Sequence, residues 1–225
     1  MVRVLAVSDV VDEGLWADVG PARGVDVILA CGDLPFEYLG YLMNALDVPL
    51  VFVPGNHDPD LSGYRTSRSG LTMRAGFSSQ PPWPEGAVSV DGRIAEVATL
   101  RIAGLGGCLR YSGGPNQYSD RQQAVRARRL ALRAMLRRPQ DGRRLDVLLT
   151  HAPPSGVGDE GDAVHRGFSA FHALTGRLRP ALLLHGHVQR GVVAEADLHL
   201  GSTIVRNVTG RHLLDIEPVG FDRAR

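Results

Sequence analysis

The chain alternates between short apolar runs and polar segments, and five of the runs contain almost no polar residue. Strands that are buried on both faces have this pattern, because neither face meets water. Each run breaks at a polar or glycine-containing group, as the end of a strand does. The five predicted strands are residues 2–7, 25–31, 49–54, 147–150 and 181–184.

Helical periodicity predicts three helices, over residues 36–46, 119–138 and 167–177. In the second of these, Ser119 suits an N-cap, and Pro139 follows the expected end. Its apolar residues are expected to form one stripe, with arginines on the other side. The predicted stripe comprises Ala124, Val125, Ala131, Leu132, Met135 and Leu136.

The remaining segments read as strands or as surface. Residues 87–104 predict two or three strands around a hairpin turn at Asp91-Gly92. Residues 191–217 predict further consecutive strands. Residues 59–84 are rich in Ser, Arg, Gly and Pro, and they predict a long surface excursion.

Composition narrows the class of protein. The 225 residues are 44% hydrophobic, which suffices for a core and excludes a disordered chain. The 25 basic and 24 acidic residues leave a net charge of +1, which is not the balance of a protein that coats nucleic acid. There is no apolar run of roughly 20 residues and no signal-peptide pattern, so we expect a cytoplasmic protein without membrane contact. No linker or repeat divides residues 1–225, which are expected to form a single domain.

The counts of cysteine and histidine restrict the metal chemistry. Cys31 and Cys108 are too few for a disulfide framework or a thiolate metal cage. The chain has eight histidines. Any metal site must therefore use imidazole and carboxylate ligands.

A group that can bind a metal follows each of the five predicted strands. The carboxyl ends of strands in an open α/β sheet meet at one rim, so these groups are expected to converge. A single Gly-Asp is usually a turn, and a single histidine is usually a hydrogen-bonded core residue. Five in order indicate a metal site instead. The five candidates are Asp9, Asp33, Asn56, His151 and His187.

This ordered series resembles the signature of calcineurin-like metallophosphoesterases, and the resemblance spans residues 5–189. Residues 106–118 and 151–154 are similar to a small, single-domain, bacterial-type branch of that family. The resemblance implies an α/β fold, a four-layer α/β/β/α sandwich of the metallo-dependent phosphatase type, around a two-metal phosphoesterase site. The motifs are Asp9, Gly32-Asp33, Gly55-Asn56-His57-Asp58, His151 and Gly186-His187.

The resemblance also implies the role of each motif residue. Asp33 would bridge two divalent cations about 3.5–4 Å apart, which would clamp the phosphoryl group and activate water to hydroxide. Asn56, His151 and His187 would complete the second metal site. These mixed nitrogen and oxygen donors favour Mn, Fe or Zn over Mg.

The imidazole of His57 would point into the same pocket, since it directly follows a metal ligand. As an imidazolium it would stabilise or protonate the leaving-group oxygen. Asp58 would orient His57 through a ring nitrogen, as carboxylates behind metal and catalytic histidines do.

The sequence departs from the family at the first metal site. The usual Asp-x-His is Asp9-Val10-Val11 here, and the usual Gly-His-x-His ends at Gln189. The first site would keep Asp9, the shared Asp33 and the carbonyl oxygen of Gln189. Either this site binds a harder ion such as Mn or Mg more weakly, or the protein holds one metal only. Asp12 or Glu13 would add a carboxylate, unless both lie in the first turn of a helix.

Three further residues have two interpretations each. Arg110 and Tyr111, in a glycine-rich loop, would bind substrate by pairing with a phosphate and stacking on a base. Alternatively, this loop is only a tight connection that needs its glycines. His165 either reaches the pocket or is a hydrogen-bonded loop histidine.

The sequence therefore predicts a metal-dependent phosphodiesterase that hydrolyses a small nucleotide-like phosphate ester, with one or two divalent ions, Mn before Fe, Zn or Mg. The alternative is a nucleotide- or phosphate-binding regulatory protein with a degenerate, single-metal site. The arginines of residues 121–144 are typical of a solvated helix face, so nucleic acid is not an expected partner. The sequence carries no signal for the oligomeric state.

Overall fold

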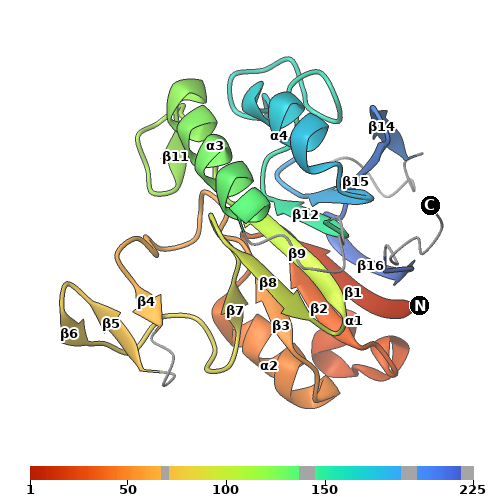
Figure 1. Cartoon of the computed structure of the whole chain (residues 1–225). Coiled ribbons are helices and arrows are strands. Elements are labelled where there is room, and N and C mark those ends of the chain that lie inside the picture. Colours follow the sequence, from red (N-terminus) through yellow and green to blue (C-terminus); the bar gives the residue numbers. More distant parts are fainter. Residues whose placement is uncertain (67–70, 137–144, 189–196, 219–225) are drawn as a thin grey trace.

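Two facing β-sheets, each covered by helices on its outer side, form the body of the protein in a computed structural model (Figure 1). The structure describes residues 1–66, 71–136, 145–188 and 197–218. Among these residues, no helix is long and apolar enough to cross a membrane. The four-layer α/β/β/α sandwich predicted from the sequence is confirmed.

The first sheet has the order β16-β1-β2-β3-β7. Its strands β1, β2, β3 and β7 are parallel, and β16 pairs antiparallel with β1. The strands are β1 (Val2–Ser8), β2 (Val27–Ala30), β3 (Leu50–Phe52), β7 (Val88–Ser89) and β16 (Gly210–Ile216).

The second sheet has the order β14-β15-β13-β12-β9-β8. Its four central strands are parallel, and β14 and β8 pair antiparallel at the two edges. The strands are β8 (Ile94–Val97), β9 (Leu100–Leu105), β12 (Val147–Thr150), β13 (Leu182–His185), β14 (Leu198–Leu200) and β15 (Thr203–Asn207).

Helices and small strands complete the described chain. The predicted helix 36–46 is confirmed with the same ends, and the five predicted buried strands are present, each within three residues of its predicted ends. The predicted surface excursion contains a small sheet of its own, β4 to β6. The elements are α1 (Glu13–Ala17), η1 (Gly20–Ala22), α2 (Phe36–Leu46), α3 (Asp120–Leu136), α4 (Ala170–Leu178), β4 (Arg65–Thr66), β5 (Thr72–Arg74), β6 (Phe77–Ser78), β10 (Cys108–Leu109) and β11 (Gln117–Tyr118).

Alternation along the strands sends side chains into two different layers. In β1, Val4 and Ala6 lie in the core between the sheets, together with Leu149 of β12. Their neighbours Leu5 and Val7 pack with the core residues under α2. Because both faces are covered, the strands read as continuous apolar runs in the sequence.

A capping box begins α3 where the sequence predicts its start. The Gln122 N–H donates to Ser119 Oγ at 3.2 Å, and the Ser119 N–H donates to Gln122 Oε1 at 2.9 Å. This reciprocal pair satisfies two N–H groups at the helix start. The predicted end at residue 138 lies outside the described residues.

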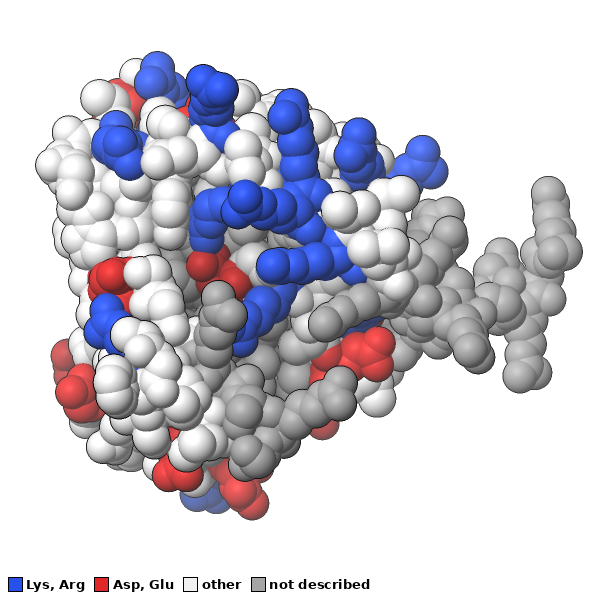
Figure 2. All heavy atoms as spheres, turned by 60° about the vertical axis from the view of Figure 1, so that its left-hand side comes forward, with Lys and Arg blue, Asp and Glu red and all other residues white. Residues whose placement is uncertain are grey.

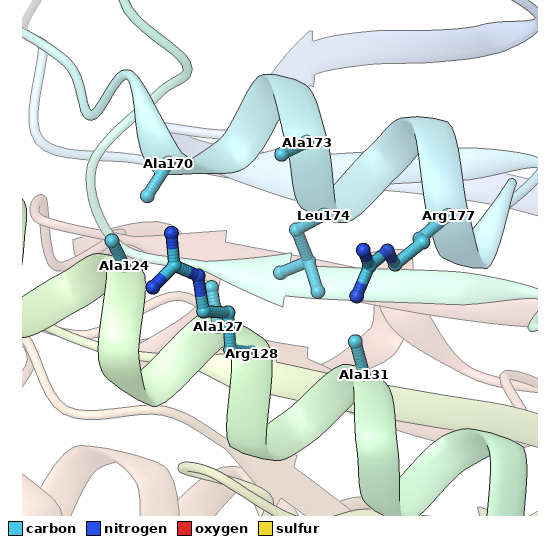
Figure 3. Close-up of a pocket in the computed structure, with 8 residues that line it drawn as sticks. All are labelled: Ala124, Ala127, Arg128, Ala131, Ala170, Ala173, Leu174 and Arg177. Carbon is cyan, nitrogen blue, oxygen red and sulfur yellow. The ribbon is translucent and has the colours of Figure 1, made fainter.

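The apolar stripe predicted for α3 is wrong for four of its six residues, whereas Ala131 is buried and Ala124 packs against the core as predicted. Val125, Leu132, Met135 and Leu136 are exposed, whereas Ala127, Leu130, Ala131 and Ala134 are buried. The small alanines let α3 lie close to its neighbour α4. The surface groove that remains between the two helices has alanines along it and an arginine from each helix beside it (Figure 3).

The hairpin predicted at Asp91-Gly92 is also wrong. There the chain passes from β7 in the first sheet to β8 in the second. The hairpin turn is at Ala98-Thr99, where β8 and β9 pair through Val97 and Leu100. Both turn residues have positive φ, 48° and 65°, as a two-residue turn of type I′ requires.

Candidate metal centre

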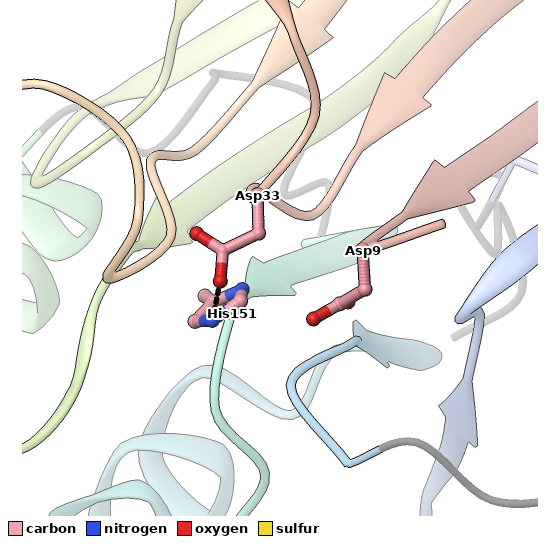
Figure 4. Close-up of side chains that lie close together, drawn as sticks. All are labelled: Asp9, Asp33 and His151. Carbon is pink, nitrogen blue, oxygen red and sulfur yellow. Dashed lines mark ion pairs between the residues drawn. The ribbon is translucent and has the colours of Figure 1, made fainter. Parts of the chain in front are cut away.

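Two carboxylates from the first sheet meet an imidazole from the second at the carboxyl ends of the parallel strands (Figure 4). Asp9 follows β1, Asp33 follows β2 and His151 follows β12. One ligand atom of each lies within 4.8 Å of the others. The convergence that the sequence predicts for these three residues is therefore present.

The backbone is strained where it presents these groups. Asp9, Asp33 and His187 have φ of 61°, 57° and 67°, a left-handed conformation that few non-glycine residues adopt. Such conformations cost free energy and cluster at functional sites. Here they turn the side chains toward the rim directly after the strands end.

Two glycines of the motifs give the ligands room. A Cβ at Gly55 would overlap the Asp33 carboxylate, and a Cβ at Gly186 would overlap Ser8 and the Asp9 carboxylate. Any larger residue would push the carboxylates away from the rim. This close approach explains why glycine precedes Asn56 and His187.

The hydrogen bonds of His151 identify the nitrogen that is directed into the site. The Nδ1–H group donates to the Cys31 carbonyl at 2.7 Å. Nε2 then faces Asn56 Oδ1 at 2.9 Å and Asp33 Oδ2 at 3.3 Å. A ring held in this way offers Nε2 as a metal ligand.

His187 lies beside Asp9 and His151, and the ring nitrogen that it leaves for a metal is Nδ1, whereas His151 leaves Nε2. The backbone N–H of His187 donates to Asp9 Oδ2 at 2.9 Å, and the centre of its ring lies 4.8 Å from that of the His151 ring. Nε2 donates to the Val164 carbonyl at 2.8 Å, which leaves Nδ1 for a metal. His187 is not one of the three residues whose ligand atoms lie within 4.8 Å.

The electrostatics of the site favour a bound cation. Burial raises the pKa of Asp9, and the charge of His151 offsets only part of this effect. Burial alone would also raise the pKa of Asp33. The hydrogen bond and charge of His151 outweigh this effect and lower the Asp33 pKa. Burial disfavours the protonated, charged form of His151. The hydrogen bond to Asp33 and the charge of Asp33 nevertheless raise the pKa of His151 to about 9. The metal-free site therefore holds a proton where a cation would bind.

The pKa of His187 moves the other way. Burial and the nearby charge of His151 lower the pKa of His187 to about 4. At neutral pH this ring is uncharged, the form that binds metals. With two carboxylates, one carboxamide and two imidazoles, the donor set fits a divalent transition-metal ion.

Asn56 and His57 each contribute a group to this centre. The group from His57 is its backbone N–H, which was not expected from the sequence. Asn56 Oδ1 contacts His151, and the Asn56 Nδ2–H group donates to the Tyr111 hydroxyl at 3.2 Å. The His57 side chain is exposed, and its N–H donates to Asp33 Oδ1 at 2.8 Å.

The orientation of His57 by Asp58 is not supported. The Asp58 carboxylate is buried and accepts the N–H groups of Gly55 at 2.7 Å and Asp33 at 3.0 Å. Burial raises the pKa of Asp58, although these two N–H groups oppose the shift. Asp58 thus braces the backbone of two ligand loops rather than the His57 ring.

The two predicted substrate residues have different surroundings. Tyr111 is 39% exposed, and its hydroxyl accepts the hydrogen bond from Asn56, so it lies at the centre. The Arg110 guanidinium donates to Gln122 Oε1 at 3.0 Å and to the Gln117 carbonyl at 3.4 Å, toward the start of α3.

The described residues at the predicted first metal site do not replace its missing imidazoles. Val11 packs against the core under α2. Asp12 is the N-cap of α1, with Oδ1 accepting the Leu15 N–H at 2.9 Å, and it pairs with Arg211 at 3.3 Å. Asp12 therefore serves the helix, and Glu13 lies in its first turn. Gln189 lies outside the described residues.

Sequence reasoning missed one residue that holds the centre, Asn116. Asn116 has φ of 52° and donates through Nδ2 to the carbonyls of Gly55 at 2.9 Å and Asp58 at 3.1 Å. His165 pairs with Asp162 and also lies 5.5 Å from the His187 ring. Glu160, Asp162 and His165 form a second group of possible ligands.

A four-layer sandwich with carboxylate, carboxamide and imidazole groups at the shared strand ends defines the class of metal-dependent phosphoester hydrolases. The chain belongs to the calcineurin-like phosphoesterase family, whose sequence profile matches residues 2–191. Members of this family bind divalent metals and hydrolyse phosphate esters.

Comparison with other proteins supports the fold. One crystal structure is 17% identical with a TM-score of 0.64, and the match covers 98% of this chain and 99% of the other. The crystal structure of TT1561 of Thermus thermophilus is 16% identical with a TM-score of 0.56, covering 90% of this chain and 87% of the other. No curated protein matches the sequence.

Proposed function

We propose that this chain is a phosphodiesterase that hydrolyses a small nucleotide-like phosphate ester with Mn as its metal. The convergence of Asp9, Asp33 and His151, with Asn56 against His151, is the observation that carries the proposal. A divalent cation at these residues supplies positive charge to the phosphoryl group and lowers the pKa of a water ligand. The chain itself must then orient the ester and protonate the leaving group.

The exposed imidazole of His57 is the proposed proton donor to the leaving-group oxygen. It follows Asn56 directly, and its N–H is held by Asp33 at 2.8 Å, so its backbone is fixed beside the metal ligands. Solvent exposure lets the ring reach a substrate that arrives from outside. Positioned proton donors contribute about 10²- to 10⁴-fold in rate.

Substrate recognition is assigned to Tyr111 and Arg110. The Tyr111 ring is partly exposed beside Asn56, where it can stack on a base or another flat group. Arg110 is exposed on the same loop and can exchange its Gln122 contact for a phosphate. A nucleotide-like ester presents a flat group and a phosphate to this loop at once.

The test is hydrolysis by Mn-loaded protein of bis(4-nitrophenyl) phosphate and of 4-nitrophenyl phosphate. Faster diester hydrolysis is expected, and with a dinucleotide, whose alkoxide leaving group needs a proton, kcat should be lowered about 100-fold or more in His57→Ala. The matched control is His199→Ala, which removes an exposed histidine of β14. Turnover by His57→Ala equal to that of the control would remove His57 from the mechanism. Asp33→Asn should reduce activity more than Gln189→Ala, since Asp33 would serve both metals.

The second candidate function is a nucleotide- or phosphate-binding regulatory protein with one metal. The packing of Val11 into the core and the use of Asp12 as a helix cap favour it, because both leave the first site short of ligands. It requires about one Mn per chain and binding of a nonhydrolysable phosphodiester without turnover. Metal content measured alongside the hydrolysis assay separates the two functions.

A further inference from the structure

The loop formed by residues 155–167, between β12 and α4, contacts the metal centre through one peptide group. The Val164 carbonyl accepts the Nε2–H of His187 at 2.8 Å. The next residue, His165, places its ring 5.5 Å from the His187 ring. The orientation of His187 therefore depends on where this loop lies.

A single carboxylate holds the other end of the same peptide group. Asp162 Oδ1 accepts the N–H of His165 at 2.6 Å and that of Val164 at 2.8 Å. The His165 N–H and the Val164 carbonyl belong to one planar peptide unit and point in opposite directions. Asp162 binds the N–H of this peptide unit, and His187 binds its carbonyl.

The Asp162 carboxylate also restrains the neighbouring ring. Its Oδ2 lies 2.8 Å from His165 Nδ1, and Glu160 lies 3.7 Å from the same nitrogen. Asp159 closes the loop by accepting the N–H groups of Gly156 at 2.8 Å and Gly167 at 3.0 Å. The loop is thus built so that its Val164 carbonyl has one position.

We propose that Asp162 is a positioning residue for His187, acting through the Val164–His165 peptide group. The fixed carbonyl keeps the His187 proton on Nε2 and leaves Nδ1 for the metal. The inference rests on the metal centre proposed above and adds a residue to it that no ligand motif contains. Groups that orient metal ligands in this way change metal affinity about 10- to 100-fold.

Asp60 provides a matched control. Its Oδ1 accepts the Ser62 N–H at 2.8 Å in a turn of the surface excursion, the same kind of contact that Asp162 makes. The Asp162 side chain is 51% exposed and that of Asp60 is 54% exposed. Substituting either aspartate removes one exposed, turn-forming carboxylate, but only Asp162 leads to His187.

The first measurement is calorimetric titration of Mn into chelator-stripped protein. Asp162→Ala should weaken the tightest Mn site by about tenfold or more, and Asp60→Ala should leave it unchanged. Asp162→Asn should bind nearly as the wild type does, because an amide oxygen still accepts both N–H groups. Equal Mn affinity in Asp162→Ala and the wild type would overturn the inference.

The second measurement is the ¹H–¹⁵N NMR spectrum of the histidine rings in metal-free protein. His187 should carry its proton on Nε2 in the wild type and in Asp60→Ala, and should be a mixture of the Nε2–H and Nδ1–H tautomers in Asp162→Ala. An unchanged His187 spectrum in folded Asp162→Ala would contradict the positioning role. If the wild type bound no Mn, the metal centre would be wrong, and this spectrum would still decide what Asp162 does.

Discussion

Main-chain carbonyls set the chemistry of both ligand histidines. His151 donates Nδ1–H to the Cys31 carbonyl, and His187 donates Nε2–H to the Val164 carbonyl. The two rings therefore offer different nitrogens to the same site, Nε2 and Nδ1. Any residue can supply a carbonyl, so neither contact has a signature in the sequence.

Metal binding should depend on pH through His151. The carboxylates Asp33 and Asp9 face this ring and His187 lies beside it, and the Asp33 contact raises the His151 pKa to about 9. A cation must displace that proton, so Mn affinity should rise as pH increases from 6 to 8, by up to about tenfold per pH unit. Titration in buffers of different ionisation enthalpy should show about one proton released per Mn at pH 7. Binding without proton release would contradict this assignment.

The Tyr111 hydroxyl should contribute to metal affinity separately from substrate binding. It accepts the Asn56 Nδ2–H at 3.2 Å, which keeps Asn56 Oδ1 turned toward His151. A net hydrogen bond is worth about 0.5–1.5 kcal/mol, so Tyr111→Phe should weaken Mn binding about two- to tenfold. Tyr118→Phe in the adjoining β11 is the control, and calorimetry is the measurement. No difference between the two variants would leave Asn56 oriented by His151 alone.

At the scale of elements, the sequence predicted correctly those helix ends that depend on neighbouring residues. The helix 36–46 and the start of α3 at Ser119 were both found, because periodicity and capping act within a few residues. The hairpin at Asp91-Gly92 failed for the opposite reason. The Asp91 carboxylate accepts the Gly106 N–H at 2.7 Å and pairs with Arg126, and the chain changes sheets there. A turn signal does not distinguish a hairpin from a crossover.

The same limit applies to the site. Strand ends could be located from the sequence, and so could the convergence of Asp9, Asp33 and His151, which follow them. The loops that brace them could not, since Asn116 reaches the centre through a contact 61 residues away in sequence. The burial of side chains on α3 was predicted incorrectly because the helix packs small alanines and Leu130 inward, whereas its other large apolar residues stay exposed.

The connection between β3 and Asn56 should not tolerate a side chain at Gly55. A Cβ there would overlap Asp33 Oδ1, so Gly55→Ala should lose about 1–3 kcal/mol of stability and most Mn binding. Gly176→Ala is the control, because a Cβ in α4 meets nothing within 4 Å. It should gain up to about 1 kcal/mol from helix propensity. Urea unfolding and Mn titration check both, and tight Mn binding by Gly55→Ala would contradict the close approach.

At the scale of the whole molecule, the centre exists only when the two sheets face each other. Asp9 and Asp33 come from the first sheet, and His151 and His187 come from the second. The core between the sheets, with Val4 and Leu149 among its members, sets their spacing. The proposed metal ligands are thus fixed by the most buried part of the fold, whereas the proposed substrate loop with Arg110 and Tyr111 stays at the surface.

Arginine side chains gather on the face of the molecule seen in Figure 2. Two arginines of α3 have structural partners. Arg126 pairs with Asp91 at 2.6 Å and lies over the Tyr118 ring at 4.0 Å, and Arg133 donates to the Gly92 carbonyl. These contacts hold α3 to the segment where the chain changes sheets. Part of the positive surface charge therefore comes from arginines whose contacts hold α3 in place.

A small substrate should accordingly react with little dependence on salt. The net charge is +1, so kcat/KM for bis(4-nitrophenyl) phosphate should change less than about twofold between 50 and 300 mM NaCl. Replacing the exposed Arg121 and Arg129 by glutamine should leave it unchanged. A nuclease that uses this face would instead cleave oligonucleotides, with activity that falls steeply with salt as phosphate contacts are lost. Steep salt dependence that disappears in the double variant would replace the small-ester proposal with a nucleic-acid substrate.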